Sequence, residues 1–425
     1  MDFLVSLKKN SFLRKTLALS ANVLNGFPSR GMTIIGITGT TGKTTLSFFL
    51  KQILENENEK IGLIGTAGYY LKNKVIYHSG SGPATTPDPF LLFSLLKTMK
   101  KEGIRKVIME VTSFGLMYQR VYSLSFKIGI LTNISYSHHI KIHGSFENYL
   151  HSKLQLFQLV SPSGLSILPK DSQYFELFKK NSRAKVISYG FDEQSDYYAK
   201  ILREEENGIE FEVYKKGEGK ILKMKLNIPF RANVLNALVG IIVSDYFGLD
   251  REKTKEKIEN LKTIPGRLEI IEFKGRKILV DKANTEIAFQ EIIQLINLYK
   301  PKKKIAVYGN FGGSSFQERE KLAKLALDFF DLTIITEDDP LDEPRDKGIN
   351  DFIDYAQKNQ IDQKKYLAIL DRRNAIEEAL KRSRPGDFVA ILGRGNEKWL
   401  LYNKEKIPFD DREVVQELLN SIKLE

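Results

Sequence analysis

The sequence contains no cysteine, which excludes disulfide bonds, zinc ribbons and thiol nucleophiles. It also lacks an uninterrupted apolar run of about 18 residues, the length that a membrane-spanning helix requires. The 425 residues are 42% hydrophobic and 28% charged, as in ordinary globular proteins, and this length predicts two or three domains. We expect a monomeric, cytoplasmic protein.

Acidic residues are too few to balance the basic ones, and the formal net charge is +12. Such an excess can attract nucleic acid or an anionic membrane. It is spread over lysine-rich segments such as 97–101 and 253–257, however, and no nucleic-acid recognition motif accompanies it. We therefore expect a solvated surface that attracts anionic substrates, and no nucleic-acid partner.

Residues 1–30 form a basic amphipathic segment without the pattern of a signal peptide. A helix of this kind can lie on an anionic membrane. More often such a helix packs on its own domain, and we favour packing over membrane contact.

The most informative pattern is the glycine-rich run 36–45, Gly-Ile-Thr-Gly-Thr-Thr-Gly-Lys-Thr-Thr, between an apolar segment and a helical one. Glycines let the backbone curl so that several N–H groups and a helix N-terminus face one anion. Lys43 would then reach the outer phosphates, and Thr44 would offer a hydroxyl to Mg²⁺. Ile37 occupies the first glycine position of the usual G-x-x-x-x-G-K-[ST] pattern. The context nevertheless predicts a binding site for a nucleoside triphosphate.

From residue 31, apolar β-rich runs alternate with helical patterns, which predicts an α/β fold with a mostly parallel sheet. Strands are expected at 33–38, 61–65, 106–111, 128–132 and 165–168, and helices at 46–54, 88–101 and 146–159. Short strands between 186 and 226 predict an antiparallel appendage, and a helical pair follows at 232–247 and 251–261.

Pro265-Gly266 marks the clearest boundary, after which the alternation restarts. Strands are expected at 277–280, 304–308, 332–336 and 387–392, and helices at 286–299, 317–330, 374–382 and 413–422. We therefore predict three parts: an N-terminal segment (1–30), a P-loop central domain (31–264) and a smaller α/β, Rossmann-like C-terminal domain (265–425).

Several polar residues follow predicted strands, where parallel sheets bind their ligands. Glu110 ends one strand, and its carboxylate would suit Mg²⁺, although alone it is a weak signal. His138, His139 and His143 lie together after another strand, either as ligands, as a base, or as an ordinary polar loop. Lys153 looks by itself like an ordinary helix lysine.

The second domain has polar strand ends at Asp338-Asp339-Pro340 and at 393–397. Acidic residues there suit a ligand that carries an ammonium group. The alternative, helix capping and turn chemistry, is equally consistent with these residues alone.

In their order along the chain, these segments resemble the signatures of the Mur ligase family, most closely those of the UDP-N-acetylmuramoyl-tripeptide synthetases. The matching segments are 38–45, 85–89, 109–113 with Arg120, 132–144, Lys153, 233–238, 265–267, 280–281, 393–397 and 408–413. The resemblance implies an ADP-forming amide ligase that uses ATP and Mg²⁺. It implies that an amino acid is added, through an acyl phosphate, to a muramyl-peptide-like acceptor in peptidoglycan precursor synthesis.

The resemblance also implies roles for individual residues. It assigns the ATP phosphates to Gly39, Thr40, Thr41, Gly42, Lys43, Thr44 and Thr45, and the nucleoside to Asn236, Arg267 and Asp281. It assigns the acceptor to Thr85, Thr86, Thr112 and Arg120, and the amino acid to Arg319, Asp338, Asp339, Gly393 and Glu397. Magnesium would be held by Thr44, Glu110, a loop histidine and an N-carboxylated Lys153. The catalytic groups would be Lys43, Lys153 and that histidine, which is either His138 or His139 because the loop is one residue longer than in the family.

Two departures from the family bear on the substrates. Family members carry an N-terminal domain that binds the uridine nucleotide, whereas only 30 residues precede the phosphate loop here. We expect that domain to be absent, which leaves the acceptor carrier open between UDP, a lipid and another group. Enzymes that add meso-diaminopimelate show Asp-Asn-Pro-Arg where this chain has Asp338-Asp339-Pro340-Leu341. The missing arginine disfavours diaminopimelate and favours a residue that ends in an amine, such as lysine or ornithine.

Three other classes stay open. One is a related ligase that acts on pseudomurein or on a poly-glutamyl acceptor, and another is a plain P-loop ATPase or kinase. The third is a non-catalytic partner subunit, suggested by residues of the second domain that differ from the family: Lys282, Asn284, Ser314, Ser315 and Asn396. Phe114, in the central domain, also differs from the family.

Overall fold

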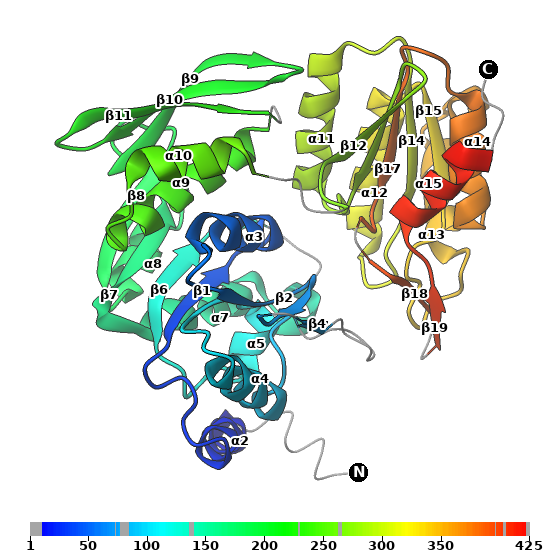
Figure 1. Cartoon of the computed structure of the whole chain (residues 1–425). Coiled ribbons are helices and arrows are strands. Elements are labelled where there is room, and N and C mark those ends of the chain that lie inside the picture. Colours follow the sequence, from blue (N-terminus) through cyan, green and yellow to red (C-terminus); the bar gives the residue numbers. More distant parts are fainter. Residues whose placement is uncertain are drawn as a thin grey trace. The chain divides into compact units, whose positions relative to one another are not determined.

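A computed structural model describes residues 11–72, 74–76, 85–135, 140–227, 230–261, 266–395, 397–402 and 405–421. The chain forms two compact units, residues 1–261 and 262–425. Figure 1 labels the helices and strands of both units.

The first unit is built on an eleven-stranded sheet (Figure 1). At its centre, β1 (Thr33–Thr38) pairs in parallel with β5 (Lys106–Glu110) and β6 (Phe126–Leu131). Beyond β5 lie β2 (Ile61–Gly65), β3 (Gly68–Tyr70) and β4 (Val75–Ile76). Beyond β6 lie β7 (Val160–Pro169), β8 (Lys185–Gly190), β9 (Tyr197–Glu205), β10 (Gly208–Lys215) and β11 (Gly219–Leu226).

Helices cover both faces of this sheet, and its central strands are therefore buried on both sides. One apolar core joins the sheet to α3 (Lys43–Leu54), α9 (Arg231–Tyr246) and α10 (Arg251–Glu259). The other joins it to α4 (Pro89–Lys101), α5 (Ser113–Met117), α7 (Phe146–Gln158) and α8 (Phe175–Asn181). Along β1, Ile35 and Ile37 belong to the first core and Ile34 to the second, as the two-residue period of a strand requires.

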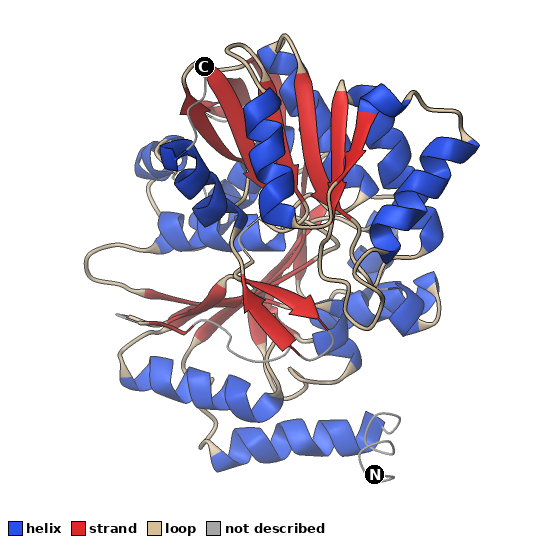
Figure 2. Ribbon diagram, turned by 90° about the vertical axis from the view of Figure 1, so that its right-hand side faces the viewer, coloured by secondary structure: helices blue, strands red, loops and turns tan. Residues whose placement is uncertain are grey.

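Helix α2 (Ser11–Leu24) is the outermost helix of the first unit and packs against α4 (Figures 1 and 2). Its Ala18, Ala21 and Asn22 are buried. Asn22 Nδ2 donates to Ser123 O at 3.2 Å, which ties the helix to the segment before β6. The N-terminal segment thus packs on its own unit over these residues. No helix within the described ranges is long and apolar enough to cross a membrane.

The second unit contains a six-stranded sheet in the order β12-β13-β17-β14-β15-β16. Its strands are β12 (Glu269–Phe273), β13 (Arg276–Asp281), β14 (Lys304–Gly309), β15 (Leu332–Thr336), β16 (Tyr366–Ala368) and β17 (Phe388–Leu392). All pairings are parallel except that of β12 with β13. A small hairpin, β18 (Trp399–Tyr402) and β19 (Glu405–Pro408), follows the sheet.

The helices of the second unit are α11 (Glu286–Tyr299), α12 (Phe316–Phe329), α13 (Lys347–Lys358), α14 (Arg372–Arg382) and α15 (Asp411–Ser421). Helices α14 and α15 share one apolar core with the strands. They are joined by a fully buried ion pair, in which Arg372 Nε and Asp411 Oδ1 are 2.8 Å apart. Arg372 also donates to Leu392 O at 2.9 Å, so this pair anchors the end of β17.

The predicted fold class, an α/β fold with a mostly parallel central sheet and a separate C-terminal α/β part, is confirmed. One expectation needs correction: β8 is not part of an antiparallel appendage, because it pairs in parallel with both β7 and β9. Within this stretch, the antiparallel pairings are those of β10 with β9 and with β11. Helix α13 and the hairpin β18–β19 were not predicted. The strands of the hairpin are only four residues long, whereas α13 has apolar residues at 349, 352, 353 and 356, a helical spacing that could have been found.

Candidate functional site

The glycine-rich run forms the turn between β1 and α3. Gly39 and Gly42 have φ values of +153° and +79°, which glycine adopts without strain. A Cβ atom on Gly39 would overlap Thr132 Oγ1, so a larger residue does not fit there. Thr132 Oγ1 donates to Thr41 O at 2.7 Å, and Asn133 Oδ1 accepts the Thr41 N–H at 3.0 Å. The turn is therefore held in place by the segment that follows β6.

Two lysines meet at this turn. Lys43 Nζ and Lys153 Nζ both donate to Gly39 O, at 2.8 and 2.6 Å. Lys153 comes from α7 and is only 1% exposed. Tyr149, one helical turn earlier, has its ring 4.6 Å from Lys153 Nζ and its hydroxyl 2.9 Å from Thr40 Oγ1. Burial, and then the nearby Lys43 ammonium, lower the pKa of Lys153 well below its ordinary value.

Glu110 lies at the end of β5, beside the same turn, and is fully buried. Its Oε2 accepts the Thr44 hydroxyl at 3.0 Å. Thr66, just after β2, donates its N–H to Oε1 at 3.0 Å and its hydroxyl to Oε2 at 2.9 Å. Thr45 follows Thr44 in the first turn of α3. The structure thus brings together a hydroxyl and a carboxylate from separate parts of the chain.

The four residues assigned to the acceptor adjoin this carboxylate. Thr86 Oγ1 accepts the Thr112 N–H at 2.9 Å, and Arg120 Nη1 donates to Thr86 O at 2.7 Å. Thr85 Oγ1 lies 3.0 Å from Thr66 Oγ1. Burial lowers the pKa of Arg120. One network of hydroxyl groups therefore runs from the acceptor candidates to the end of β5.

His138 and His139, the two candidates for the metal-ligating histidine, lie outside the described residues. The choice between them stays a prediction.

His143, at the end of the short helix α6 (Ile140–His143), is described and is buried. Its ring stacks on Phe114 with centroids 5.2 Å apart and meets Tyr149 edge-on at 5.5 Å. Its Nδ1 is 3.3 Å from Ser152 Oγ, whereas its Nε2 has no hydrogen-bond partner among the described residues. Burial, with a smaller effect of Lys153, lowers the pKa of His143 to about 4. The ring is therefore neutral at pH 7.

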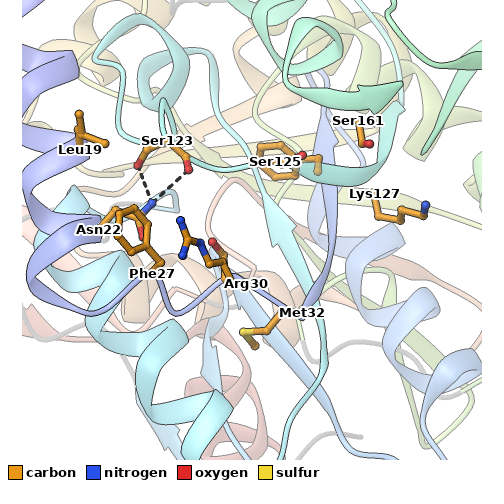
Figure 3. A pocket seen from close by; sticks show the side chains of 11 residues that line it. Leu19, Asn22, Phe27, Arg30, Met32, Ser123, Ser125, Lys127 and Ser161 are labelled. Carbon is orange, nitrogen blue, oxygen red and sulfur yellow. Dashed lines mark hydrogen bonds between the residues drawn. The ribbon is translucent and has the colours of Figure 1, made fainter. Parts of the chain in front are cut away.

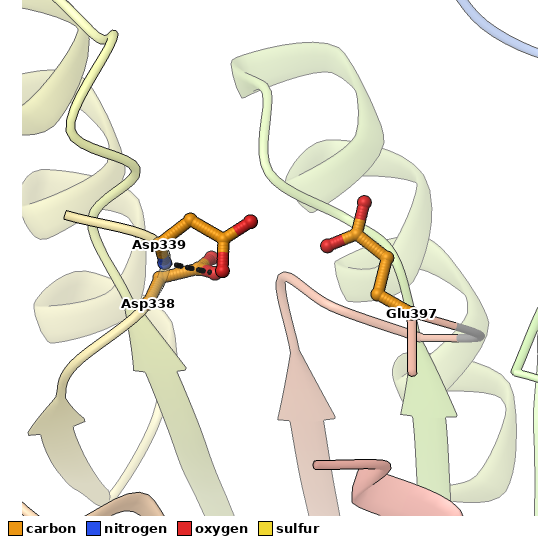
Figure 4. Close-up of side chains that lie close together, drawn as sticks. All are labelled: Asp338, Asp339 and Glu397. Atoms are coloured by element: carbon orange, nitrogen blue, oxygen red, sulfur yellow. Dashed lines mark hydrogen bonds between the residues drawn. The ribbon is translucent and has the colours of Figure 1, made fainter. Parts of the chain in front are cut away.

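The second unit holds a cluster of acidic side chains. Asp338 and Asp339 follow β15 and Glu397 follows β17, and carboxylate oxygens of the three lie within 4.8 Å of one another (Figure 4). Fully buried Arg394 donates to Asp338 at 2.9 Å and to Asp339 at 2.6 Å, and Lys282 pairs with Glu397. Burial raises the pKa of Asp339 to about 6, with Arg394 opposing that rise. The cluster thus contains three carboxylate side chains and two basic side chains that pair with them.

Other candidates of the second unit lie beside this cluster or apart from it. The Gly393 N–H donates to Asp281 O at 3.1 Å, and Asp281 Oδ2 accepts the Leu268 N–H at 2.8 Å. Arg267 acts electrostatically on both Asp281 and Glu397. The nucleoside candidates Arg267 and Asp281 therefore adjoin the amino-acid candidates.

Arg319 is not bonded to the acidic cluster. Its guanidinium is 3% exposed and pairs with Asp351 at 2.6 Å and Glu343 at 2.5 Å. Asn236, the nucleoside candidate of the first unit, lies on α9 and donates to Asn233 Oδ1 at 3.2 Å. The side chains of Arg319 and Asn236 thus form their hydrogen bonds and ion pairs with other side chains of the protein.

Some contributors to the two sites were not given a role from the sequence: Thr66, Tyr149, Lys282 and Arg394. Thr66 follows directly on a predicted strand, so the strand-end rule would have found it. Tyr149 precedes Lys153 by four residues, the spacing of neighbours on a helix face. Arg394 was visible only as a member of a matched segment, and Lys282 only as a departure from the family, because an ion pair between distant segments leaves no local pattern.

Residues 37–244 match the family model of the Mur ligase middle domain, and residues 266–395 match that of the Mur ligase, glutamate ligase domain. The UDP-N-acetylmuramoyl-L-alanyl-D-glutamate–2,6-diaminopimelate ligase of Clostridium botulinum is 34% identical over 417 residues, which cover 97% of this chain and 83% of that relative. The enzyme of the same name from Chlamydia trachomatis is 31% identical over 96% of this chain and 83% of its own length.

The chain belongs to the Mur ligase family. Solved structures agree on the fold: MurF ligase from Thermotoga maritima in complex with ADP has a TM-score of 0.68 at 19% identity, covering 94% of this chain and 83% of its own. Folylpolyglutamate synthase of Mycobacterium tuberculosis has a TM-score of 0.69 at 15% identity, covering 89% of this chain and 92% of its own. As a Mur ligase, the protein is an ATP-dependent, amide-forming ligase of peptidoglycan precursor synthesis.

The residues of this Mur ligase fit the ATP and Mg²⁺ on which the family's chemistry depends. The turn offers a lysine ammonium and a helix N-terminus to phosphate oxygens. The Thr44 hydroxyl and the Glu110 carboxylate are oxygen ligands of the kind that Mg²⁺ prefers, and they are 3.0 Å apart. Thr44 and Glu110 would hold the ion, which would neutralise charge on the phosphates.

Gly65, the last residue of β2, allows the Glu110 carboxylate to take this position. A Cβ atom there would overlap Glu110 Oε1. We expect Gly65→Ala to displace the carboxylate and to lower Mg²⁺-dependent turnover about tenfold or more. The measurement is a titration of ADP release against Mg²⁺, with a thermal melt to confirm that the variant is folded. An unchanged Mg²⁺ requirement would contradict the prediction.

Glu291, on α11, makes the stability of the second unit of the Mur ligase depend on pH. Burial, and then Asp281, raise its pKa from 4.5 to about 7. Between these values the folded state binds more protons than the unfolded state, so stability decreases as the pH rises from about 4.5 to about 7. We expect Glu291→Gln to remove this loss and to stabilise the unit at pH 8 by about 2–3 kcal/mol.

The measurement for Glu291→Gln is chemical denaturation at pH 5 and pH 8. The exposed Glu405, also in the second unit, provides the matched control Glu405→Gln, for which no such difference is expected. Equal effects of the two substitutions would contradict the role of Glu291.

Proposed function

We propose that this Mur ligase joins an amino acid to the carboxyl end of a muramyl-peptide acceptor through an acyl phosphate, with release of ADP and phosphate. One observation carries the proposal. Lys43 and Lys153 converge on the carbonyl of Gly39, while Thr44 and Glu110 pair at the other side of the same loop. A turn that only bound nucleotide would not require a fully buried lysine from a distant helix.

Each of these groups has a task in forming the acyl phosphate. A carboxylate is inert to amines, so its oxygen must first take the terminal phosphoryl group of ATP. Lys43 would stabilise the charge that develops on the phosphoryl oxygens. Thr44 and Glu110 would orient the cation that accompanies ATP. The amine of the amino acid then attacks the acyl carbon, and phosphate leaves.

Lys153 is suited to carry a carbamate. Its lowered pKa favours the neutral amine, the form that attacks the carbon of CO₂, and one proton is released to solvent as the carbamate forms. The product is an anion beside the Lys43 ammonium, so the repulsion between two cations becomes attraction. We therefore propose an N-carboxylated Lys153 as a magnesium ligand, with His138 or His139 as the companion ligand.

The acceptor is proposed to bind at Thr85, Thr86, Thr112 and Arg120, whose network adjoins Glu110. The curated relatives are named for a UDP-linked muramoyl dipeptide. We propose a muramyl dipeptide as the acceptor, carried either by UDP or by a lipid.

The amino acid is proposed to end in an amine. Asp338, Asp339 and Glu397 outnumber Arg394 and Lys282, which leaves one negative charge for an ammonium group. The nearby Arg267 does not cancel it, because it is balanced by Asp281. The relatives, however, are named as ligases of 2,6-diaminopimelate. Lysine, ornithine and meso-diaminopimelate must therefore be compared directly.

The test offers each amino acid with UDP- and lipid-linked muramyl dipeptides and records ADP release and amide product by mass spectrometry. We expect product with lysine or ornithine. Product only with meso-diaminopimelate would refute the proposed amino acid but not the ligase. ADP release without any amide, or no turnover with any acceptor, would refute the proposed reaction.

A further inference from the structure

Helix α2 leaves one of its faces to solvent. Its inner face, with Ala18, Ala21 and Asn22, is buried against the unit. The rest of the helix carries five exposed apolar side chains, with exposed fractions of 75% for Phe12, 38% for Leu17, 47% for Leu19, 50% for Val23 and 72% for Leu24. At 100° per residue, Phe12, Leu19 and Val23 lie opposite Ala18 and Ala21, whereas Leu17 and Leu24 flank Ala21.

No charged residue interrupts this outer face. The two cations of the helix lie on its inner half. Arg14 donates to Met117 O at 3.1 Å and is 4.5 Å from the ring centre of Tyr118, and Lys15 is 5.1 Å from that of Tyr122. Thr16 and Ser20, the polar residues between the apolar ones, are uncharged. An exposed helix face with several large apolar side chains and no charge marks an interaction site.

The surroundings of the outer face are basic. From residue 3 to residue 54 the sequence contains no aspartate or glutamate. Exposed Arg30 follows α2, and exposed Lys97 and Lys101 lie on α4, which packs against it. The acids of α4 are confined to its two flanking positions, Asp88 and Glu102. Two copies of this chain would repel each other here, whereas an anionic surface would be attracted.

A cavity of about 450 Å³ borders the same helix (Figure 3). Leu19 and Asn22 line it together with Arg30 and Lys127, and none of its eleven lining residues is acidic. Four serines line it as well: Ser29, Ser123, Ser125 and Ser161. The Ser123 hydroxyl donates to Ala18 O at 3.3 Å. Asn22 is 3% exposed, and its Oδ1 has no hydrogen-bond partner within the described part of the chain.

The chemistry of the cavity matches a phosphodiester that carries hydroxyl groups. Guanidinium, ammonium and serine hydroxyl groups donate to phosphate oxygens. The free acceptor of Asn22 would take a hydroxyl proton from the same headgroup. The cavity is lined by residues that precede or begin β1, β6 and β7, whereas the phosphate loop follows the end of β1. It is therefore separate from the ATP site.

We propose that the outer face of α2 docks on an anionic lipid bilayer, with a phosphate-bearing headgroup in the cavity beside Leu19. The apolar side chains enter the boundary between headgroups and acyl chains, and the exposed Arg30, Lys97 and Lys101 meet lipid phosphates. The helix lies in the interface, and no part of it spans the membrane.

The test is flotation of the full-length Mur ligase with vesicles of phosphatidylcholine alone or mixed with phosphatidylglycerol. We expect binding to the mixed vesicles only, weakened by salt. The double substitution Leu19→Glu with Val23→Glu should lower the partition coefficient about tenfold or more. The matched control is Leu202→Glu with Leu249→Glu, which adds the same charge at two other exposed leucines and should retain binding.

A second pair of variants tests the role of the cavity. Arg30→Gln with Lys127→Gln should reduce binding more than Lys180→Gln with Lys223→Gln, which removes equal charge elsewhere. Circular dichroism and ADP release report that each variant is folded and active. Absence of binding to phosphatidylglycerol, or equal binding by the α2 variant and its control, would overturn the proposal. So would a dimer in sedimentation analysis that the α2 substitutions abolish while lipid binding is absent.

Discussion

Lys153→Ala is expected to abolish amide formation, with a loss in kcat of about 10³-fold or more. The reason lies in the position of Lys153, which is fully buried and bonded to Gly39 O at 2.6 Å inside the phosphate loop. Alanine removes both this contact and the only amine there, apart from that of Lys43, that can carry a carbamate. Bicarbonate cannot restore the ligand, so added bicarbonate is expected to leave the variant inactive.

The measurement for Lys153→Ala is ADP release together with mass spectrometry of the product. A second readout separates the carbamate from a structural role: ¹³C-labelled bicarbonate should give a carbamate signal in the wild type and none in the variant. Lys179→Ala, at an exposed lysine of the same unit, is the control and should retain turnover. Unchanged turnover of Lys153→Ala would refute the carbamate role.

Thr44→Val is expected to lower kcat by about 10²- to 10³-fold at saturating ATP. Valine keeps the volume of the buried threonine but removes the hydroxyl that lies 3.0 Å from Glu110 Oε2. The change thus deletes one oxygen ligand and leaves the turn in place. Thr44→Ser is the matched control, because it retains the hydroxyl and should stay within about tenfold of the wild type.

Magnesium titrations decide between a metal ligand and a structural hydroxyl. If Thr44 ligates the ion, Thr44→Val should need more Mg²⁺ and Thr44→Ser should not. If the hydroxyl only supports Glu110, both variants should respond to Mg²⁺ as the wild type does, and the valine variant should differ only in thermal stability. The second pattern would rule out a direct role of Thr44.

Much of the fold could be predicted from local patterns. The strand expected at 33–38 was found at Thr33–Thr38, and that at 61–65 was found at Ile61–Gly65. Both segments are continuous apolar runs bounded by polar residues, because central strands of a parallel sheet are buried on both faces. Helix α13 was missed, although Ile349, Phe352 and Ala356 follow the spacing of an amphipathic helix and are buried.

The candidate site was predictable to a lesser extent. A phosphate loop is encoded in one short segment, so Lys43 and Thr44 could be identified directly. Lys153 could not, because nothing in its own segment distinguishes it from a solvent-exposed helix lysine. Only the resemblance pointed to it, and only the packing of α7 beneath the turn places its amine on Gly39 O.

The sequence by itself determined the alternation of strands and helices, the position of the nucleotide turn and the absence of thiol chemistry. These features depend on residues that are neighbours in the chain, or on composition. The tertiary structure alone decided which side chains meet: Lys153 with Gly39, Glu110 with Thr44, and Arg394 with Asp338 and Asp339. It also decided that α2 keeps an apolar face in solvent. The reason is that burial and pairing over distances of 50 or more residues follow from how layers pack, which no local pattern records.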